Sequence, residues 1–227
     1  MKICFKIILV LVLAIIFTSS VVYAADSDEM QRSGFLSTYD GLKQSDEYMV
    51  EYTFINENVD FKSYDKIILD YVVFFVKDDA EYKGLQANEM QQLADAFHKS
   101  IIKALSDKYQ FVPEPGPGVM RIRLALTNVE PIKLGADVLT AVVPVGIALN
   151  LVKVGTTGTS IGVGRTSMEA EIFDTQSKMR LAAAIDTDVG KKYTGYKGDT
   201  KWSHAEGTFE AWAKDLREML DKLSERK

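Results

Sequence analysis

Three acids near residue 170 are the best candidates for chemistry in this sequence. Glu169 and Glu171 alternate along a predicted strand at residues 165–173, and Asp174 follows that strand. Side chains two residues apart on a strand share one face, roughly 7 Å from each other. The pair could therefore hold a cation or act as an acid pair, and these three acids form a candidate functional surface.

The alternative, which we favour, is a solvated sheet face without a catalytic role. Opposite charges on neighbouring strands stabilise a sheet by pairing across the ladder. The arginines predicted to lie within reach are Arg121, Arg123 and Arg180. We therefore add Arg121 and Arg123 to the candidate surface.

Metal and phosphate chemistry find little support in the sequence. The chain has two histidines and one cysteine, Cys4, so a zinc site would need unusual ligands. Residues 155–164 are rich in glycine, but no basic residue follows at the spacing of a phosphate-binding loop. We predict no catalytic set, no metal and no cofactor.

Residues 64–76 are a strongly apolar run that would organise the sheet. They are rich in β-branched and aromatic residues, and both faces of the strand they would form are apolar. Such a pattern predicts a central strand that is buried on both faces. Asp70 interrupts this run, so we expect it at a strand end or in a hydrogen bond, because an unpaired buried charge is too costly.

Three further strands follow from alternation of apolar and polar residues. Residues 119–129 form one strand, with a short strand at 109–112 and a Pro/Gly turn before it. Residues 165–173 and 179–187 form a hairpin joined by 174–178, in which Asp186 falls on the wetter face. The expected core side of the first two long strands comprises Met120, Ile122, Leu124, Leu126, Met168, Ala170 and Ile172.

Two amphipathic helices are predicted from apolar stripes at spacings of three and four residues. The first runs from Asn88, with Gln91 completing a capping box, to about residue 108. The second runs from Ser203, with Glu206 as its capping partner, to about residue 223. The stripes are Met90, Leu93, Phe97, Ile101, Ala104 and Leu105, and Phe209, Trp212, Leu216, Met219, Leu220 and Leu223.

These elements predict an α/β (α+β) two-layer sandwich, a mixed β-sheet with two amphipathic helices on one face. We place a single domain at residues 64–224, preceded by a lead-in segment at 25–63. Within the lead-in, residues 33–42 carry apolar side chains at helical spacing, and we expect a short helical turn that docks on the domain.

Residues 1–24 have the form of a secretory signal peptide. Lys2 and Lys6 precede an apolar run, and small residues at the exit predict cleavage after Ala24. The alternative is an uncleaved anchor, but the apolar stretch 7–22 falls short of the roughly 20 residues that a spanning helix needs. We expect a periplasmic protein without a lipid anchor, because no cysteine follows the signal.

The charge of the mature chain argues against one class of partner. Without Lys2 and Lys6, 25 basic residues remain against 32 acidic ones, so the net charge is −7. This balance disfavours nucleic acid and gives no reason to expect an anionic membrane surface.

Residues 131–164 form an apolar, glycine-rich insertion. Its segment 135–154 has one acid, Asp137, and one base, Lys153. Three alternatives remain: a buried helix pair broken at Pro144, an oligomer-forming or lipid-contacting insertion, and a membrane span, which lacks strong flanking charges. If the insertion mediates an interaction, its contact residues are Leu139, Val142, Val143, Pro144, Ile147 and Leu151.

Several short motifs, taken in order, resemble the bacterial family catalogued as domain of unknown function 3313. They are Ser33-Gly34-Phe35-Leu36-x-x-Tyr39-x-x-Leu42, Tyr64-x-Lys66-Ile67, Arg121-Ile122-Arg123-Leu124-Ala125-Leu126-Thr127, Glu169-x-Glu171-Ile172-x-Asp174 and Phe209-x-x-Trp212-Ala213-x-x-Leu216. The resemblance implies an exported envelope protein, usually a lipoprotein, with no assigned catalytic residues. The order of elements is also similar, more loosely, to the domain of the Tol periplasmic protein and the curli secretion channel subunit.

Three functions are open at this point. We favour a non-enzymatic envelope protein that binds another envelope protein or itself, with the insertion as an exposed apolar element. The alternative is a small-ligand or lipid-binding module whose lid or cavity wall is the insertion. Independently of this choice, residues 135–154 could contact the membrane peripherally. The third is a hydrolase that uses Glu169, Glu171 or Asp174.

Overall fold

The computed structural model describes residues 30–75, 86–130, 165–189 and 202–226. Contacts divide the chain into residues 1–31 and 32–227, and the fold is that of the second unit. The predicted signal peptide and the insertion at 131–164 lie outside the described residues. No helix among the described residues has both the length and the apolar character needed to cross a membrane.

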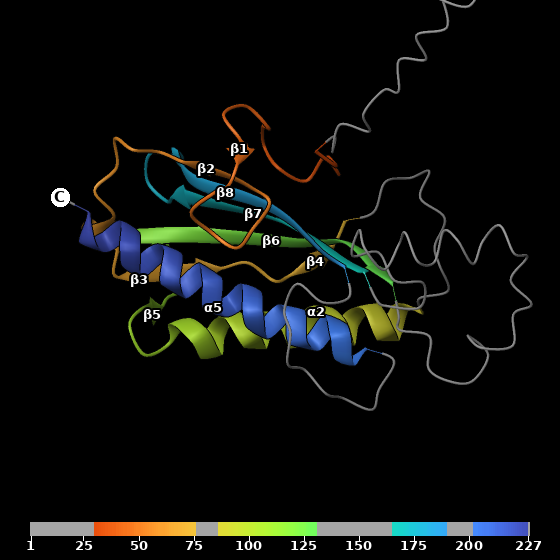
Figure 1. Cartoon of the computed structure of the whole chain (residues 1–227). Helices are drawn as coiled ribbons and strands as arrows, with labels where there is room; N and C mark the ends of the chain where they lie inside the picture. Colours follow the sequence, from red (N-terminus) through yellow and green to blue (C-terminus); the bar gives the residue numbers. More distant parts are fainter. Residues whose placement is uncertain (1–29, 76–85, 131–164, 190–201, 227) are drawn as a thin grey trace, which may run out of the picture. The chain divides into compact units, whose positions relative to one another are not determined.

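An eight-stranded mixed sheet forms one layer (Figure 1). Its order is β1-β2-β8-β7-β6-β3-β5, with β4 beside β6. Strands β6, β7 and β8 pair antiparallel, whereas β3 and β4 run parallel to β6. The strands are β1 (Lys43–Gln44), β2 (Tyr52–Ile55), β3 (Lys66–Leu69), β4 (Val73–Phe74), β5 (Gln110–Phe111), β6 (Val119–Glu130), β7 (Arg165–Asp174) and β8 (Arg180–Val189).

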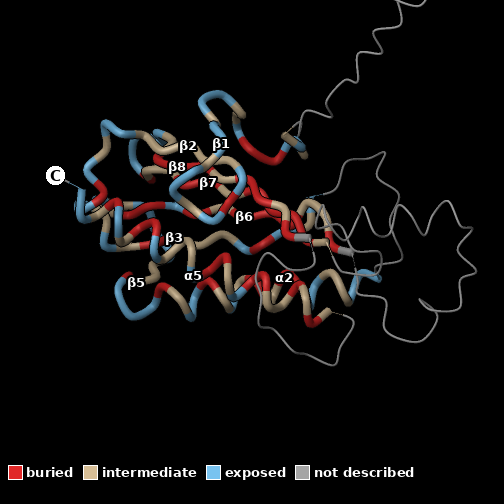
Figure 2. Tube along the Cα trace, viewed as in Figure 1, coloured by how far each residue is buried: buried red, intermediate tan, exposed pale blue. Residues whose placement is uncertain are grey.

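Helices α2 (Ala87–Leu105) and α5 (Ser203–Glu225) form the second layer on one face of the sheet (Figure 1). They meet through stacked aromatic rings, with the Phe97 and Phe209 centroids 4.9 Å apart and Trp212 5.6 Å from Phe97. The buried sides of both helices face buried positions of β6 and β7 (Figure 2). The predicted two-layer sandwich is confirmed.

Both predicted helix starts are wrong in detail. Helix α2 is capped by Gln86, whose backbone N–H donates to the Glu89 carboxylate at 3.1 Å, so the capping box lies two residues before Asn88. In α5 the N-cap is Trp202, whose carbonyl accepts from the Glu206 N–H at 3.0 Å. Ser203 is buried as the first helical residue rather than standing ahead of the helix as a cap.

The predicted central strand at 64–76 is wrong as a single buried element. It divides into β3 and β4, and only part of it has neighbours on both sides, because β5 pairs with β3 at Lys66 and Ile67 alone. Tyr71, Val73 and Phe75 consequently remain exposed. The central strands are β6 and β7, which alternate as predicted and pair Ile122 with Ile172.

Residues 43–63 of the segment predicted as a lead-in add strands to the sheet. Strand β2 pairs antiparallel with β8, and β1 pairs with β2 at the edge. A short 3-10 helix, η2 (Phe61–Ser63), follows and buries Phe61. Asp70 follows the end of β3, as expected, and its backbone N–H donates to the Ile122 carbonyl at 2.9 Å.

Candidate functional site

Glu169 and Glu171 project from β7 on the face of the sheet that is opposite to the helices. Residues 33–42, which we call the N-terminal strap, cover these acids, and Glu169 and Glu171 are only 1% and 0% exposed. The interpretation of this face as solvated is therefore wrong. Docking of the strap is confirmed, although residues 33–42 form bends and turns instead of a helical turn.

Glu169 binds the strap through both carboxylate oxygens. Oε1 accepts the backbone N–H of Ser33 at 2.6 Å. Oε2 accepts the N–H of Leu36 at 3.3 Å and the hydroxyl of Tyr39 at 2.7 Å. Burial raises the pKa of Tyr39, and its hydrogen bond to Glu169 raises that pKa further.

Glu171 joins the strap to the sheet. Its Oε1 accepts the backbone N–H of Ser37, and its Oε2 lies 3.2 Å from Nη1 of Arg123. Arg123 also places its guanidinium 4.9 Å from the centre of the Phe35 ring, which is the geometry of a cation–π contact. The predicted pairing of Arg123 with an acid across the ladder is thus observed.

Arg180 holds the end of the strap from the neighbouring strand β8. Its guanidinium donates to the carbonyl of Thr38 at 2.6 Å and to the carbonyl of Asp40. Burial lowers the pKa of Arg180, while the charges of Glu171 and Asp40 oppose this shift. Two acids and two arginines of the sheet therefore bind the strap. The acids accept from its N–H groups, Arg180 donates to its carbonyls, and Arg123 contacts its Phe35 ring.

The other two nominated residues bind elsewhere. Arg121 pairs with Asp70, with Nε 2.8 and 3.0 Å from the two carboxylate oxygens. Asp174 closes the β7–β8 turn by accepting from the backbone and hydroxyl of Ser177, each at 2.6 Å. Burial pushes the pKa of Asp174 up, but the Ser177 and Tyr64 donors outweigh this and lower it.

In this arrangement one face of the sheet binds the strap, a segment of the same chain. A general acid or base must reach a substrate within hydrogen-bond distance, yet the strap covers both carboxylates and fills their acceptor positions. Within the described residues, no group of three or more His, Cys, Asp or Glu side chains could hold a metal ion. The geometry thus places Glu169, Glu171 and Arg123 together for binding the strap.

Sequence reasoning missed a second pair of buried acids, on β8. Asp186 faces the helices, where it accepts from the indole N–H of Trp212 at 2.6 Å and from the backbone of Glu51 at 3.0 Å. Its predicted place on the wetter face is wrong, because these partners satisfy its charge inside the core. An indole N–H on the buried stripe of α5 signals the need for an acceptor, but not which one.

Asp188, the second acid of this pair, accepts from Thr208 at 2.6 Å. His204 lies 3.5 Å from the same oxygen. In the part of the chain that the structure describes, Asp188 Oδ1, His204 Nε2 and Thr166 Oγ1 are buried without a hydrogen-bond partner. This polar cluster lies under the first turn of α5.

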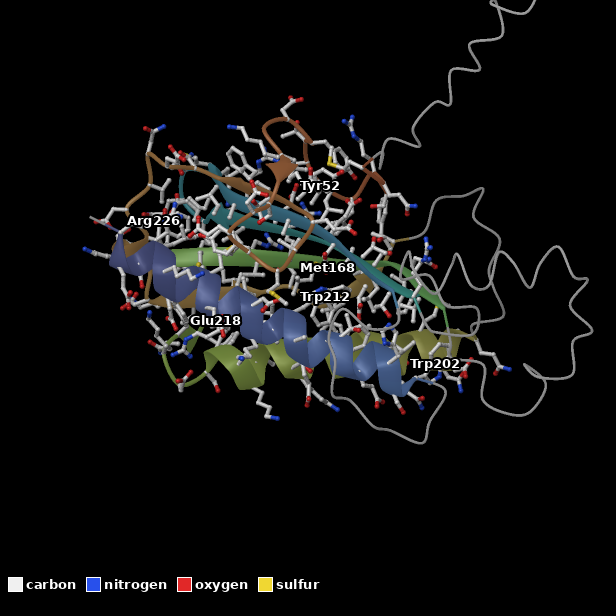
Figure 3. The ribbon with its side chains drawn as sticks, viewed as in Figure 1. Tyr52, Met168, Trp202, Trp212, Glu218 and Arg226 are labelled. Carbon is white, nitrogen blue, oxygen red and sulfur yellow. The ribbon has the colours of Figure 1, made fainter. Side chains whose placement is uncertain are left out.

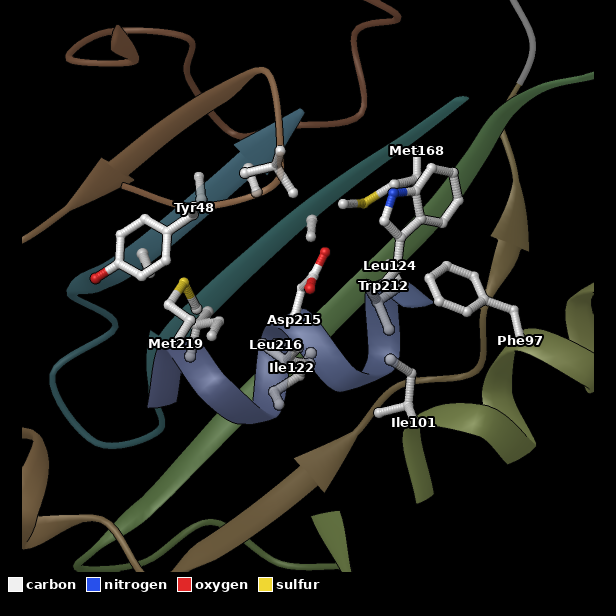
Figure 4. A pocket seen from close by; sticks show the side chains of 16 residues that line it. Tyr48, Phe97, Ile101, Ile122, Leu124, Met168, Trp212, Asp215, Leu216 and Met219 are labelled. Atoms are coloured by element: carbon white, nitrogen blue, oxygen red, sulfur yellow. The ribbon is translucent and has the colours of Figure 1, made fainter. Parts of the chain in front are cut away.

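An apolar pocket lies between α5 and the sheet (Figure 4). Its cavity volume is about 50 Å³, and the whole space between the surrounding atoms, with open solvent at the mouth included, is about 560 Å³. Small side chains on the sheet leave this space, chiefly Ala170, Ala182 and Ala184. Tyr48 and Asp215 are the two lining residues with a phenol or carboxylate group.

Two sets of residues from the sequence lie outside the described part of the chain. One is the insertion set of Leu139, Val142, Val143, Pro144, Ile147 and Leu151. The other is Gly158-Thr159-Ser160-Ile161-Gly162, which the prediction of no catalytic set overlooked and which matches the Gly-x-Ser-x-Gly spacing of a hydrolase nucleophile elbow. The match has little specificity, because four of residues 155–164 are glycine.

Comparison with known proteins gives one sequence family. The family described as "Protein of unknown function (DUF3313)" matches residues 31–216. No curated protein matches the chain.

Solved structures are similar at low identity. A PelC dodecamer from Paraburkholderia phytofirmans, in the form of a single-substitution variant, is 12% identical with a TM-score of 0.39, covering 73% of this chain and 94% of that one. Protein XCC0632 from Xanthomonas campestris, of family DUF330, is 10% identical with a TM-score of 0.39, covering 74% and 93%. Likeness of this order transfers no function.

Proposed function

The chain belongs to the family described as "Protein of unknown function (DUF3313)", and from this premise we propose that it is an exported, non-enzymatic protein of the cell envelope. In this proposal the signal peptide is cleaved after Ala24, the mature protein resides in the periplasm, and it acts by binding another envelope protein or a second copy of itself.

The observation that carries the proposal is the use of Glu169 and Glu171 as receptors for the strap. Their oxygens accept three backbone N–H groups, one hydroxyl and one guanidinium N–H. These acids were the best candidates for a hydrolase, and their hydrogen bonds support a structural role instead. A binding function is further supported by the exposed side chains of Tyr71, Val73 and Phe75 at the sheet edge.

The insertion provides the test of this function. Two charges placed in its apolar run, V142D/I147D, are expected to abolish self-association or partner recovery of residues 25–227. The matched control T157D/S160D adds the same charge to the glycine-rich part of the same segment and should keep both. The readouts are mass by light scattering after size exclusion, partner recovery from the envelope, and circular dichroism. Unchanged mass and recovery in V142D/I147D would contradict the proposal.

A second candidate function is a small-ligand or lipid-binding module. The pocket beneath α5 favours it, because the lining is mainly apolar and the mouth is open. Its cavity volume of about 50 Å³ is below the roughly 300–1,000 Å³ of ligand pockets, so a ligand would need the lining side chains to move. A periplasmic sample that carries no co-purified ligand in native mass spectrometry would count against this candidate.

A further inference from the structure

The pocket beneath α5 has the lining of a site for a hydrocarbon chain. Alanines of β7 and β8 form one wall, and Trp212, Leu216 and Met219 of α5 form the other (Figure 4). Trp212 turns its N–H away to Asp186, so the indole presents an apolar surface here. Apolar lining of this kind gives a bound chain dispersion contacts and no hydrogen bonds.

Two methionines make the pocket adaptable. The cavity volume, about 50 Å³, is too small for a long hydrocarbon chain as it stands. Met168 and Met219 lie on opposite sides of it, from β7 and α5 (Figure 4). Methionine is unbranched and changes rotamer at low cost, so a bound hydrocarbon chain would have to displace these two side chains toward the mouth.

Cations gather at the Tyr48 end of the pocket. Nζ of Lys222 lies 5.3 Å from the centre of the Tyr48 ring, and Nη2 of Arg226 lies 3.2 Å from the Tyr48 hydroxyl. Arg226 also pairs with Glu47 at 2.9 Å. Lys222 has no ion pair among the described residues, and its side chain is exposed to solvent.

An anionic head would be attracted to Lys222 and Arg226 at the Tyr48 end of the pocket, which fixes the direction of the ligand. We infer that the pocket binds a single-chain anionic amphiphile, with its hydrocarbon chain beneath α5 and its carboxylate or phosphate at Lys222 and Arg226. This inference rests on the second candidate function and is independent of self-association.

Trp212 allows a direct test. The chain has two tryptophans, and Trp202 lies at the start of α5 (Figure 3). In W202F, dibromostearate should quench Trp212 in a saturable way, because bromine quenches indole only at short range. In a second experiment, lysophosphatidylglycerol should displace dibromostearate and reduce the quenching of Trp212. Binding of either supports the inference, and their relative affinity separates a free fatty acid from a phospholipid source.

Matched variants test binding of the ligand's hydrocarbon chain and of its anionic head separately. A184L fills the pocket and should weaken binding at least about tenfold, or 1.4 kcal/mol, whereas A87L adds the same side chain to the exposed first turn of α2 and should not. K222Q should weaken binding of stearate but not of stearyl alcohol. K214Q removes a charge from the exposed side of the same helix and should have no effect. Because K222Q changes a surface residue, it remains informative if A184L fails to fold.

The outcomes are distinct. If stearate and stearyl alcohol bind equally well and K222Q behaves as K214Q, the pocket does not select an anionic head. The inference then falls, while the second candidate function remains. If dibromostearate does not quench Trp212 in a saturable way, or if neither stearate nor stearyl alcohol competes with it, the inference and the second candidate function both fall.

Discussion

A buried carboxylate stabilises a fold only when its acceptor positions are filled, and Glu169 illustrates this at the scale of one residue. It receives three donors from a segment 130–136 residues away in the sequence. Leaving buried donors without an acceptor costs about 1–3 kcal/mol each. The acid therefore contributes to folding through the strap, and its removal leaves the strap without its main attachment.

Glu169→Ala should reduce the free energy of unfolding by about 3 kcal/mol, because the Ser33 and Leu36 N–H groups and the Tyr39 hydroxyl lose their acceptor. Urea denaturation followed by circular dichroism measures this. Glu210→Ala is the matched control, since Glu210 is exposed and 3.8 Å from Lys103, and it should change stability by less than about 0.5 kcal/mol. Equal stability of the two variants would contradict the strap's role.

Asp186 and Trp212 form the second residue-scale interaction, which a double-mutant cycle can isolate. Asp186→Ala and Trp212→Phe should each destabilise the fold. Because their side chains share a 2.6 Å hydrogen bond, the double variant should lose about 1–2 kcal/mol less than the sum of the two. Urea denaturation of all four proteins gives the coupling energy. Additive losses would show that the bond contributes nothing to stability.

At the scale of elements, two turns fix how the strap and the hairpin meet the sheet. Gly41 ends the strap with φ +78°, and a Cβ there would stand 2.9 Å from the Phe54 ring. The β7–β8 turn is closed by Asp174, which also accepts from the Tyr64 hydroxyl at 3.3 Å. Each turn joins segments that are distant in sequence.

Gly41→Ala should destabilise the fold by about 1–2 kcal/mol, because the left-handed conformation disfavours a Cβ and the Phe54 ring must move. Gly116→Ala is the control, since a Cβ there would meet only Val119 at 3.8 Å. Thermal melts of both variants measure the difference. If Gly116→Ala is the more destabilised of the two, the strap does not need this turn.

Burial and the nearby charge of Asp174 raise the pKa of Tyr64 to about 12. The folded state therefore holds this proton more tightly than the unfolded chain, whose tyrosine titrates near 10. The stability due to Tyr64 is fully present below about pH 10 and is lost as the pH rises through about 12. Urea midpoints measured at about pH 9 and about pH 11 should fall more steeply in the native protein than in Tyr64→Phe. Parallel pH profiles would contradict this.

The elements differ in how far the sequence predicts them. Alternation identified β6, β7 and β8, since each has one apolar face, and helical stripes identified α2 and α5. The run at 64–76 gave a wrong prediction of one buried central strand because it is apolar on both faces. The same composition is compatible with a strand such as β4, whose side chains are partly exposed. The sequence shows the strap motif and the Glu169 motif separately. Periodicity within each segment does not predict that the strap binds Glu169, because the two segments are distant in sequence.

At the scale of the whole domain, residues 43–63 contribute strands to the sheet and residues 33–42 cover one of its faces. The strap binds β7, β2 pairs with β8, and Arg226 near the C-terminus pairs with Glu47. The residues 43–63 that precede the predicted domain start at 64 therefore contribute strands, and the strap covers a face that would otherwise expose two buried acids.

Truncation tests this organisation. A chain that begins at residue 32 should unfold at the same urea concentration as one that begins at 25. A chain that begins at residue 43 loses the strap and should be less stable by several kcal/mol, because Glu169 and Glu171 lose backbone partners on a face that remains partly apolar. Denaturation with tryptophan fluorescence measures all three. Equal stability of the chains that begin at 32 and 43 would show that the strap is dispensable.

The distance in sequence between the strap and its receptor sets the order in which the protein can be completed. Ser33 is synthesised 136 residues before Glu169. At roughly 5–20 residues per second, the ribosome needs on the order of ten seconds to cover that interval. During that time the Ser33 and Leu36 N–H groups have no Glu169 acceptor, and β2 has no β8 to pair with. The strap is made early and is thus among the last segments to fold, which leaves a long interval in which a chaperone can hold the chain extended.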